Sequence, residues 1–380
     1  MNLSADTNRK LKIAVLFGGR SGEHEVSLDS ARSVLGVLDP QKYEVFQVGI
    51  THAGAWLTGS EARLALEKGD TGKLMPCTIL PDPSRPGLYV FPAKDAAQAG
   101  GIEKLTDLDV VFPVLHGTYG EDGTLQGLLE MADLAYVGAG VTGSSVGMDK
   151  GIFKDVMRAI GIPTVASIIV LRSQIEKDID AVIQQAEKVS GYPLFIKPAN
   201  LGSSVGITKC NQRADLGEGL LEAAAYDRRV LVERGVDARE IEVSVLGNDN
   251  PLASVPGEVL PSREFYSYES KYVDGTSGLL IPAPLPEETA GKIRQMAVRA
   301  YQAIDCAGMA RVDFFLEKNT GEIYLNELNS IPGFTSISMY PKLWEASGLS
   351  YTGLVDRLIE LALERKADRA RTERRFRRTS

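Results

Sequence analysis

One segment of this chain constrains its fold and its chemistry more than any other, residues 311–329 (RVDFFLEKNTGEIYLNELN). Two apolar runs flank a Lys-Asn-Thr-Gly turn, which predicts a β-hairpin. Because side chains alternate between the two faces of a strand, Arg311 and Asp313 point to one face. Glu327 and Asn329 share a face of the second strand for the same reason.

A hairpin that presents one cation and three oxygen-bearing side chains on one face is poorly explained by packing. Such oxygens suit Mg²⁺, which takes one or two carboxylates together with substrate phosphates. A solvated face of an exposed hairpin is the commoner reason for surface acids. Here the flanks are strongly apolar and phosphate-binding patterns lie upstream. We therefore interpret the hairpin as a nucleotide–metal site.

Size and composition indicate a soluble multidomain protein. A chain of 380 residues, 44% hydrophobic and 24% charged, is expected to form about two or three domains. No apolar run approaches the roughly 20 residues that span a bilayer, and the N-terminus lacks an apolar signal core. Three scattered cysteines, Cys77, Cys210 and Cys306, fit a reducing cytoplasm and apolar surroundings. We expect a cytoplasmic protein with no membrane partner.

Charge is uneven along the chain. Residues 365–380 hold eight arginines or lysines against two acids, so the rest carries 34 basic and 48 acidic residues. An acidic body argues against a nucleic-acid partner. The basic tail 365–380 is predicted to be a disordered, solubilising end, with contact to RNA or anionic lipid as the alternative.

The first part of the chain alternates strand and helix patterns. Strands are predicted over 10–17, 42–50 and 109–115, and a helix opens after Glu23, which favours a doubly wound parallel sheet. Residues 76–92 hold five prolines and are predicted to be an irregular surface excursion.

Further along, residues 148–157 predict a helix, and 194–198 and 230–233 predict strands. An amphipathic helix is predicted over 350–367, where Leu354, Val355, Leu358 and Leu361 form a core-facing stripe.

The loop at 197–206 (KPANLGSSVG) has the composition of a phosphate cradle. Small residues let backbone N–H groups approach phosphate oxygens, and lysines supply charge. The loop lacks the P-loop pattern and precedes no helix, so a P-loop NTPase is disfavoured. A plain turn is the alternative, but Lys197 before the loop and Lys150 in the same segment favour a ligand.

Four acids and a histidine follow the ends of two predicted strands in the first part of the chain. Glu23 is placed at the carboxyl edge of the sheet, where open α/β sheets bind ligands, and is a candidate anchor for a substrate ammonium. Glu25 is assigned to the helix dipole. His116 is either a ligand-edge residue or a structural one, and Glu121 and Asp122 are predicted to cap the next helix. The segment lacks G-x-G-x-x-G, which counts against an NAD-dependent dehydrogenase.

Residues 261–278 are polar, aromatic-rich and Gly/Ser-rich. They predict a closing loop that contributes Lys271 and Tyr272, with an aromatic edge strand as the alternative.

Seven motifs in this order resemble the D-alanine–D-alanine ligases of the ATP-grasp superfamily, over a span from Lys12 to about Leu363. The motifs are 18–27 (GGRSGEHEVS), 116–127 (HGTYGEDGTLQG), 148–150 (MDK), 197–206 (KPANLGSSVG), 268–272 (YESKY), 311–313 (RVD) and 326–336 (NELNSIPGFTS). The resemblance implies an α/β ATP-grasp fold, with an N-terminal doubly wound parallel-sheet domain and two α+β subdomains that sandwich ATP. The implied ranges are 1–138 (Rossmann-like, substrate-binding), 139–232 (central) and 233–380, the last with a lid loop at 262–280. A homodimer is implied as well.

The resemblance further implies that two D-alanines are joined through an acyl phosphate formed with ATP, for peptidoglycan precursors. The residues implied to bind ATP are Lys150, Lys197, Gly202, Ser203, Ser204, Glu233 and Glu240. Those implied to bind Mg²⁺, as two ions with Mn²⁺ as a substitute, are Asp313, Glu327 and Asn329.

By the same resemblance, Glu23 binds the first D-alanine ammonium and is linked to Ser203 and Tyr272, while His116 lies beside that substrate's carboxylate. Arg311 and the Gly333 N–H stabilise the oxyanion, and Lys271 and Ser338 hold the second D-alanine. A D-alanine–D-lactate ligase on the same scaffold is the alternative function, although Tyr272 favours an amine nucleophile. A nucleotide-binding regulatory protein without catalysis is a further alternative, which the intact set of hairpin residues disfavours.

Overall fold

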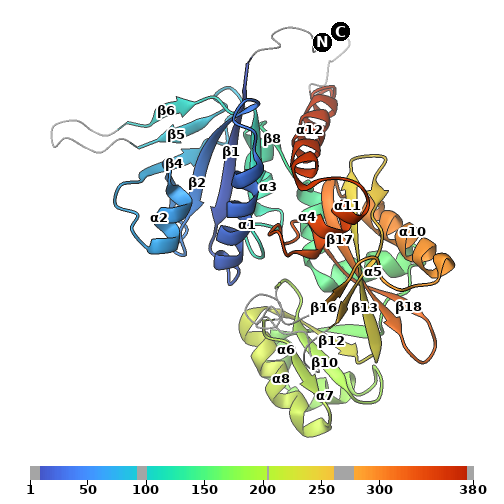
Figure 1. The fold of residues 1–380 in the computed structure, drawn as a ribbon. Coiled ribbons are helices and arrows are strands. Elements are labelled where there is room, and N and C mark those ends of the chain that lie inside the picture. Colours follow the sequence, from blue (N-terminus) through green and yellow to red (C-terminus); the bar gives the residue numbers. More distant parts are fainter. Residues whose placement is uncertain (1–8, 92–100, 203–204, 261–277, 375–380) are drawn as a thin grey trace, which may run out of the picture.

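In the part of the chain that the structure describes, the fold consists of three β-sheets with flanking helices (Figure 1). The computed structural model describes residues 9–91, 101–202, 205–260 and 278–374. Within these residues the sheets have eight, four and six strands and follow one another along the chain. None of the described helices is both long and apolar enough to cross a membrane.

The first sheet has the strand order β6-β5-β4-β3-β2-β1-β7-β8. Its parallel half is β1 (Leu11–Gly18), β2 (Tyr43–Ile50), β7 (Val110–Pro113) and β8 (Ala135–Tyr136). Its helices are α1 (His24–Val37), α2 (Ala62–Lys68) and α3 (Thr124–Met131). The strands and the first helix predicted for this region are confirmed. The central strand β1 is buried on both faces, as parallel strands covered by helices usually are.

The other half of this sheet was not predicted. It consists of β3 (Trp56–Thr58), β4 (Met75–Ile79), β5 (Leu88–Val90) and β6 (Glu103–Thr106), which pair antiparallel. The prediction of an irregular excursion at 76–92 is therefore wrong, and the sheet is mixed rather than wholly parallel. The prolines do not break the pairing, because Pro76 is the second residue of its strand and Pro81, Pro83 and Pro86 lie between β4 and β5.

The second sheet is wholly antiparallel, in the order β11-β10-β12-β9. Its strands are β9 (Ser167–Leu171), β10 (Leu194–Pro198), β11 (Thr208–Cys210) and β12 (Arg229–Arg234), covered by α6 (Arg172–Lys177), α7 (Ile179–Ala186) and α8 (Arg213–Tyr226). The strands predicted at 194–198 and 230–233 are confirmed. The domain boundary expected between residues 232 and 233 falls inside β12.

The third sheet contains the predicted hairpin, which is confirmed. Its strands are β13 (Ala238–Gly247), β14 (Leu252–Ala253), β15 (Gly257–Leu260), β16 (Gly278–Leu280), β17 (Gly308–Glu317) and β18 (Ile323–Asn329). The helices α4 (Val141–Met148), α5 (Lys150–Ala159), α10 (Glu287–Ala303) and α11 (Met339–Ala346) accompany it. The helix predicted at 148–157 is interrupted at Asp149, which ends α4 and caps α5. Phe153 and Met157 of α5 share a core with this sheet.

The last helix, α12 (Tyr351–Arg369), lies beside the first sheet. Its predicted apolar stripe is buried, as expected. The prediction of a disordered tail is wrong for residues 365–374, because Arg365 donates to the carbonyl oxygens of Gly138 and Tyr136 and stacks over the Tyr136 ring. Lys366 and Arg369 form ion pairs with acids of the same region. Residues 375–380 lie outside the described part of the chain.

The three cysteines are free and buried, as predicted. Burial raises the pKa of the Cys77 and Cys306 thiols to about 12.

Candidate active site

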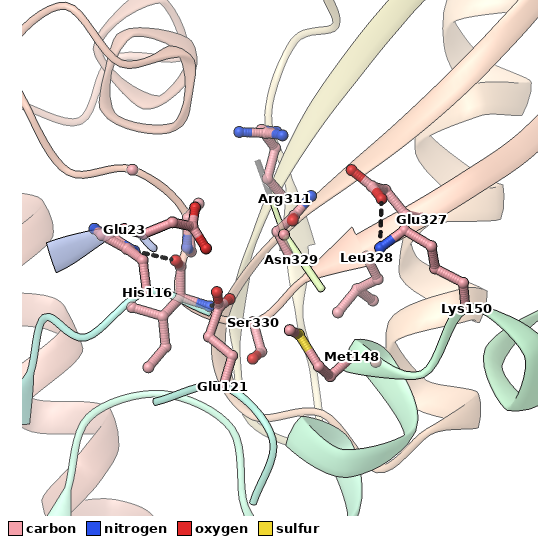
Figure 2. A pocket seen from close by; sticks show the side chains of 15 residues that line it. Glu23, His116, Glu121, Met148, Lys150, Arg311, Glu327, Leu328, Asn329 and Ser330 are labelled. Atoms are coloured by element: carbon pink, nitrogen blue, oxygen red, sulfur yellow. Dashed lines mark hydrogen bonds and ion pairs between the residues drawn. The ribbon is translucent and has the colours of Figure 1, made fainter. Parts of the chain in front are cut away.

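Eight of the predicted site residues meet in one pocket where the first sheet, the α4–α5 junction and the third sheet converge (Figure 2). The first sheet's loops contribute Glu23, His116 and Glu121, and the residues from β18 to Gly333 form the opposite wall. Of the residues predicted for the site, the pocket brings together Glu23, His116, Lys150, Gly202, Arg311, Glu327, Asn329 and Gly333.

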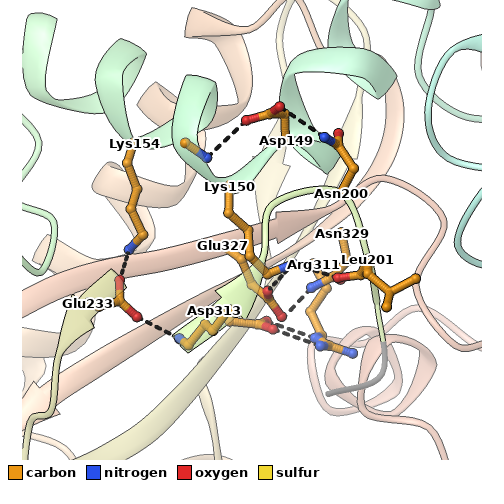
Figure 3. A network of polar contacts seen from close by, with 12 residues as sticks. Asp149, Lys150, Lys154, Asn200, Leu201, Glu233, Arg311, Asp313, Glu327 and Asn329 are labelled. Atoms are coloured by element: carbon orange, nitrogen blue, oxygen red, sulfur yellow. Dashed lines mark hydrogen bonds and ion pairs between the residues drawn. The ribbon is translucent and has the colours of Figure 1, made fainter. Parts of the chain in front are cut away.

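The hairpin places its polar side chains by strand register. Arg311 pairs with Asn329 and Asp313 with Glu327 across β17 and β18, with an irregularity directly after Asp313. The Arg311 guanidinium binds Asp313 through two bonds of 2.7 Å, Nε to Oδ1 and Nη2 to Oδ2. The Asn329 amide donates to Asp313 Oδ2 at 3.0 Å (Figure 3). The shared face that alternation predicts is therefore present.

A buried carboxylate that sequence reasoning missed also contacts Arg311. Glu242 lies on β13 directly opposite Asp313, and its Oε2 is 3.0 Å from Arg311 Nε. The only signal in the sequence is a second acid two positions after Glu240, on the same face of the strand.

Lys150 begins α5 and points toward the hairpin (Figure 3). Its Nζ donates to Leu201 O at 2.8 Å and is 3.5 Å from Glu327 Oε2. The Asp149 side chain fixes this helix start, because Oδ1 accepts the N–H groups of Gly151 and Ile152. Asp149 Oδ2 also accepts from Asn200, which ties the helix to the glycine-rich loop.

Glu233, Lys197 and Lys154 form a buried ion-pair cluster next to the glycine-rich loop. Glu233 is 2.5 Å from Lys197 Nζ and 2.6 Å from Lys154 Nζ. Burial alone raises the pKa of Glu233, but the charges of both lysines outweigh burial and hold the pKa at about 2. Lys154, whose side chain is 1% exposed, was missed by sequence reasoning. Its position one turn after Lys150 was the available signal.

The Glu23 carboxylate lies against two glycines, which leave room for it because they have no side chain. A Cβ atom on Gly117 or Gly202 would be 2.5 or 2.6 Å from Glu23 Oε2. The glycine-rich loop therefore lies next to Glu23 of the first sheet's loops. A single bound molecule can contact both the loop and this carboxylate.

Both ring nitrogens of His116 are engaged. Nδ1 is 2.9 Å from Ile331 O and Nε2 is 3.0 Å from Ser30 Oγ. Since a carbonyl only accepts, we assign the proton to Nδ1, and Ser30 then donates to Nε2. Burial lowers the pKa of His116, which favours this neutral ring. The histidine joins the first sheet to the segment after β18.

Glu121 differs from its predicted role. The N-cap residue of α3 is Gly123; Asp122, one position earlier, accepts the Thr124 N–H at 3.0 Å, and the bonds described for Glu121 lie elsewhere. Its two oxygens accept the N–H groups of Gly117 at 2.9 Å and Ile331 at 2.8 Å. Burial, followed by the charge of Glu23, raises the pKa of Glu121 to about 8. Its buried position between two loops explains why the cap prediction is wrong.

Comparison with known proteins decides the family. A model of the D-ala D-ala ligase N-terminus matches residues 12–139, and one of the D-ala D-ala ligase C-terminus matches residues 156–360. This chain belongs to the D-alanine–D-alanine ligase family. The D-alanine–D-alanine ligase of Thermoanaerobacter sp. (strain X514) is 51% identical over 372 residues, covering 95% of this chain and 99% of the relative. That of Heliobacterium modesticaldum is 49% identical, with 96% and 98% covered.

Solved structures of ligases agree. The D-alanine–D-alanine ligase from Coxiella burnetii has a TM-score of 0.79 at 38% identity, covering 95% of this chain and 96% of its own. The VanG D-Ala:D-Ser ligase from Enterococcus faecalis has a TM-score of 0.82 at 35% identity, covering 93% and 100%. The fold is therefore the ATP-grasp fold of this ligase family, as predicted.

The remaining predicted residues fall in two groups, two that the structure describes and four that it does not. Glu240 is half-buried on β13, and Ser338 lies beside Gly333, where a Cβ atom would be 3.0 Å from Ser338 Oγ. Four residues lie outside the described part of the chain, namely Ser203, Ser204, Lys271 and Tyr272. Of the predicted lid loop at 262–280, the structure describes only residues 278–280, the strand β16.

The ligase family implies a metal ion, and the hairpin offers oxygen ligands of the kind that Mg²⁺ takes. Among the described residues, no group of three or more His, Cys, Asp or Glu side chains could hold a metal on its own. Mg²⁺ does not require one, because it is bound by one or two carboxylates plus substrate phosphates. Asp313 and Glu327, facing each other with the Asn329 amide beside them, fit that requirement.

Proposed function

We propose that this chain joins two D-alanine molecules into D-alanyl-D-alanine with ATP, in the cytoplasm, to supply peptidoglycan precursors. The observation that carries the proposal is the single pocket in which Glu23 and His116 face Lys150, Arg311 and the metal-type hairpin. Family membership supports the reaction class, and the pocket supports the division into a substrate side and a nucleotide side.

On the nucleotide side, Lys150 and Lys197 hold phosphates of ATP, and the loop from Gly202 through Ser203 and Ser204 covers them. The contact of Lys150 with Glu327 and that of Lys197 with Glu233 keep both ammonium groups in fixed positions. Phosphoryl transfer needs mainly alignment and charge neutralisation, which these groups provide. Glu233 and Glu240 bind the rest of the nucleotide.

Asp313, Glu327 and Asn329 hold Mg²⁺, as two ions, and Mn²⁺ can replace it. When bound, the metal neutralises phosphate charge and orients the phosphoryl group for in-line transfer. The chain's contribution is a pair of facing carboxylates and an amide whose positions are set by strand register.

On the substrate side, Glu23 binds the ammonium of the first D-alanine with help from Ser203 and Tyr272, and His116 lies beside its carboxylate. That carboxylate attacks the γ-phosphate to give an acyl phosphate and ADP. The amine of the second D-alanine, held by Lys271 and Ser338, then attacks the acyl carbon. Arg311 and the Gly333 N–H stabilise the resulting oxyanion until phosphate leaves.

The enzyme acts as a homodimer, with small-molecule substrates and without nucleic acid. The D-alanine–D-lactate alternative is not favoured, because the curated relatives that span this chain are D-alanine–D-alanine ligases.

Phosphate release from ATP and Mg²⁺ tests the substrate. The assay is run with D-alanine, L-alanine, and D-alanine plus D-lactate or D-serine, and products are identified by mass. We expect release with D-alanine alone and D-alanyl-D-alanine as the product. Release that requires D-lactate or D-serine would overturn the assignment of the second substrate, and no release with any of them would overturn the reaction.

The metal assignment is tested by Glu327→Gln. Because a charged ligand is lost from the pocket rather than from the core, we expect turnover to fall by about 100-fold or more with the fold retained. Glu322→Gln, an exposed change on the same hairpin, serves as the control with unchanged turnover. Near-normal turnover of Glu327→Gln would contradict the assignment.

A further inference from the structure

We propose that Glu242 is a positioning residue that holds the Arg311 guanidinium in place when Asp313 binds a metal ion. The inference rests on the proposed metal site and adds a residue to it. Glu242 is absent from the set that sequence patterns single out, yet its side chain is only 7% exposed and contacts the arginine at the centre of the pocket.

The position of Glu242 follows from strand register. Glu242, Asp313 and Glu327 form one row across the adjacent strands β13, β17 and β18. Arg311 and Asn329 occupy the next row. Arg311 reaches back across the rows, so its Nε lies 2.7 Å from Asp313 Oδ1 and 3.0 Å from Glu242 Oε2. One guanidinium is therefore shared by two carboxylates on neighbouring strands.

Asp313 has two proposed roles, as the partner of Arg311 and as a metal ligand. These roles conflict unless a second carboxylate also holds Arg311. Both oxygens of Asp313 accept from Arg311, and Oδ2 also accepts from Asn329. A divalent cation that binds Asp313 competes for the same lone pairs and repels the guanidinium. With Asp313 as its sole carboxylate, Arg311 would be displaced from the pocket by the metal. Glu242 supplies a carboxylate that the metal does not need, so Arg311 keeps an anchor.

Charge leads to the same conclusion. Among the described residues, the ion pairs of this row join three acids (Glu242, Asp313 and Glu327) to two bases (Arg311 and Lys150). Removal of the Glu242 charge makes the surroundings of Asp313 less negative by one unit, so the attraction of the site for a cation weakens. Arg311 would then neutralise Asp313 more completely, and the metal would bind more weakly.

The same sheet contains a matched pair that is not in the pocket. Glu258 on β15 binds Arg239 on β13 through two bonds of 2.8 and 2.6 Å, and its side chain is also 7% exposed. Glu258→Gln therefore breaks a comparable carboxylate–guanidinium pair and leaves the row of Asp313 unchanged. It reports the cost of losing a buried pair without any effect on the metal.

The experiment measures Mn²⁺ affinity in the presence of ADP by electron paramagnetic resonance, so no turnover is needed. We expect Glu242→Gln to weaken Mn²⁺ binding about 10-fold, the size of about one charge at a partly solvated site. Glu258→Gln is expected to bind Mn²⁺ as the wild type does. Glu242→Asp retains the charge but shortens the side chain, so it should show a smaller loss, and it carries the test if Glu242→Gln does not fold.

Two results separate failure of this inference from failure of the metal site. Wild-type Mn²⁺ affinity in folded Glu242→Gln, with weakened binding in Asp313→Asn, would overturn the role of Glu242 alone. Unchanged affinity in Asp313→Asn and Glu327→Gln would show that the metal binds elsewhere and would overturn both proposals. An equal loss in Glu258→Gln would make the effect a general consequence of disturbing the sheet and would overturn the inference.

Discussion

At the scale of single residues, the clearest discovery is Lys154, a lysine fully buried against Glu233. We predict that Lys154→Met lowers the free energy of unfolding by about 3 kcal/mol, because it leaves a buried carboxylate with one cation fewer. It should also raise the KM for ATP, since Glu233 then draws Lys197 away from the phosphate side. Urea unfolding and steady-state kinetics measure the two effects.

Lys292→Met is a suitable control, because that lysine pairs with Glu288 on an exposed face of α10. A change there should cost less than about 0.5 kcal/mol. The double variant Lys154→Met/Glu233→Gln should regain part of the lost stability, as the unpaired charge is removed. Wild-type stability in Lys154→Met would show that the cluster is not a source of stability.

The residues that sequence predicted and those it missed differ in a physical way. Arg311, Asp313, Glu327 and Asn329 were found because alternation along a strand fixes which side chains share a face. Lys154 was missed and Glu121 was given the wrong role because both depend on partners far along the chain, such as Ile331, 210 residues away from Glu121. No local pattern reports such a partner.

At the scale of elements, the start of α5 decides where Lys150 lies. We predict that Asp149→Ala destabilises the protein by about 2 kcal/mol, since the cap of α5 is lost. The bond to Asn200 is lost as well, so the glycine-rich loop loosens and the KM for ATP should rise about 10-fold, with about 1.4 kcal/mol corresponding to each factor of ten. Thermal unfolding and ATP titration of the rate are the measurements.

A second capped helix separates the two effects of Asp149→Ala. Asp178 caps α7 by accepting Ala181 N–H at 3.0 Å, at an exposed position outside the pocket. Asp178→Ala should cost about 1 kcal/mol and leave the KM for ATP unchanged. If it raises the KM as much as Asp149→Ala does, the cap of α5 has no special connection to the nucleotide.

The prediction of elements was correct where the hydrophobic periodicity was strong. It was wrong where a high proline content suggested irregular structure. The amphipathic stripe of α12 and the buried run of β1 were each sufficient to identify their element. The β4–β6 meander was missed because proline content was given more weight than the apolar alternation of Cys77, Ile79, Leu88 and Val90. Proline at a strand start or in a turn removes no essential ladder bond.

At the scale of the whole molecule, the site exists because the first sheet is attached to the third. Helix α12 attaches them on one side through Arg365, and His116 and Glu121 attach them inside the pocket through Ile331. The order of motifs predicted which residues meet, but not these attachments. Each consists of a side chain bonded to backbone from another part of the chain, which composition and periodicity do not encode.

The Glu121 attachment predicts a pH dependence of stability. Its folded pKa, raised to about 8 by burial and by Glu23, lies above the ordinary value near 4.5, so the folded state holds a proton that the unfolded state releases. The stabilisation is complete below pH of about 4.5 and is lost as pH rises through about 8, by up to about 5 kcal/mol. Urea unfolding between pH 5 and pH 9 measures this slope.

Glu121→Gln isolates the contribution of this group. Glutamine cannot titrate, so the fall in stability between about pH 5 and pH 8 should flatten. Its amide oxygen can accept only one side of the bridge, so the variant should also be less stable at pH 5, by about 1–3 kcal/mol. Because the loss expected for the wild type exceeds the deficit of the variant at pH 5, the two curves are expected to approach each other and then cross as pH rises. Parallel curves would mean that Glu121 is already ionised in the folded protein, and that the link between the first and third sheets is a carboxylate at every pH.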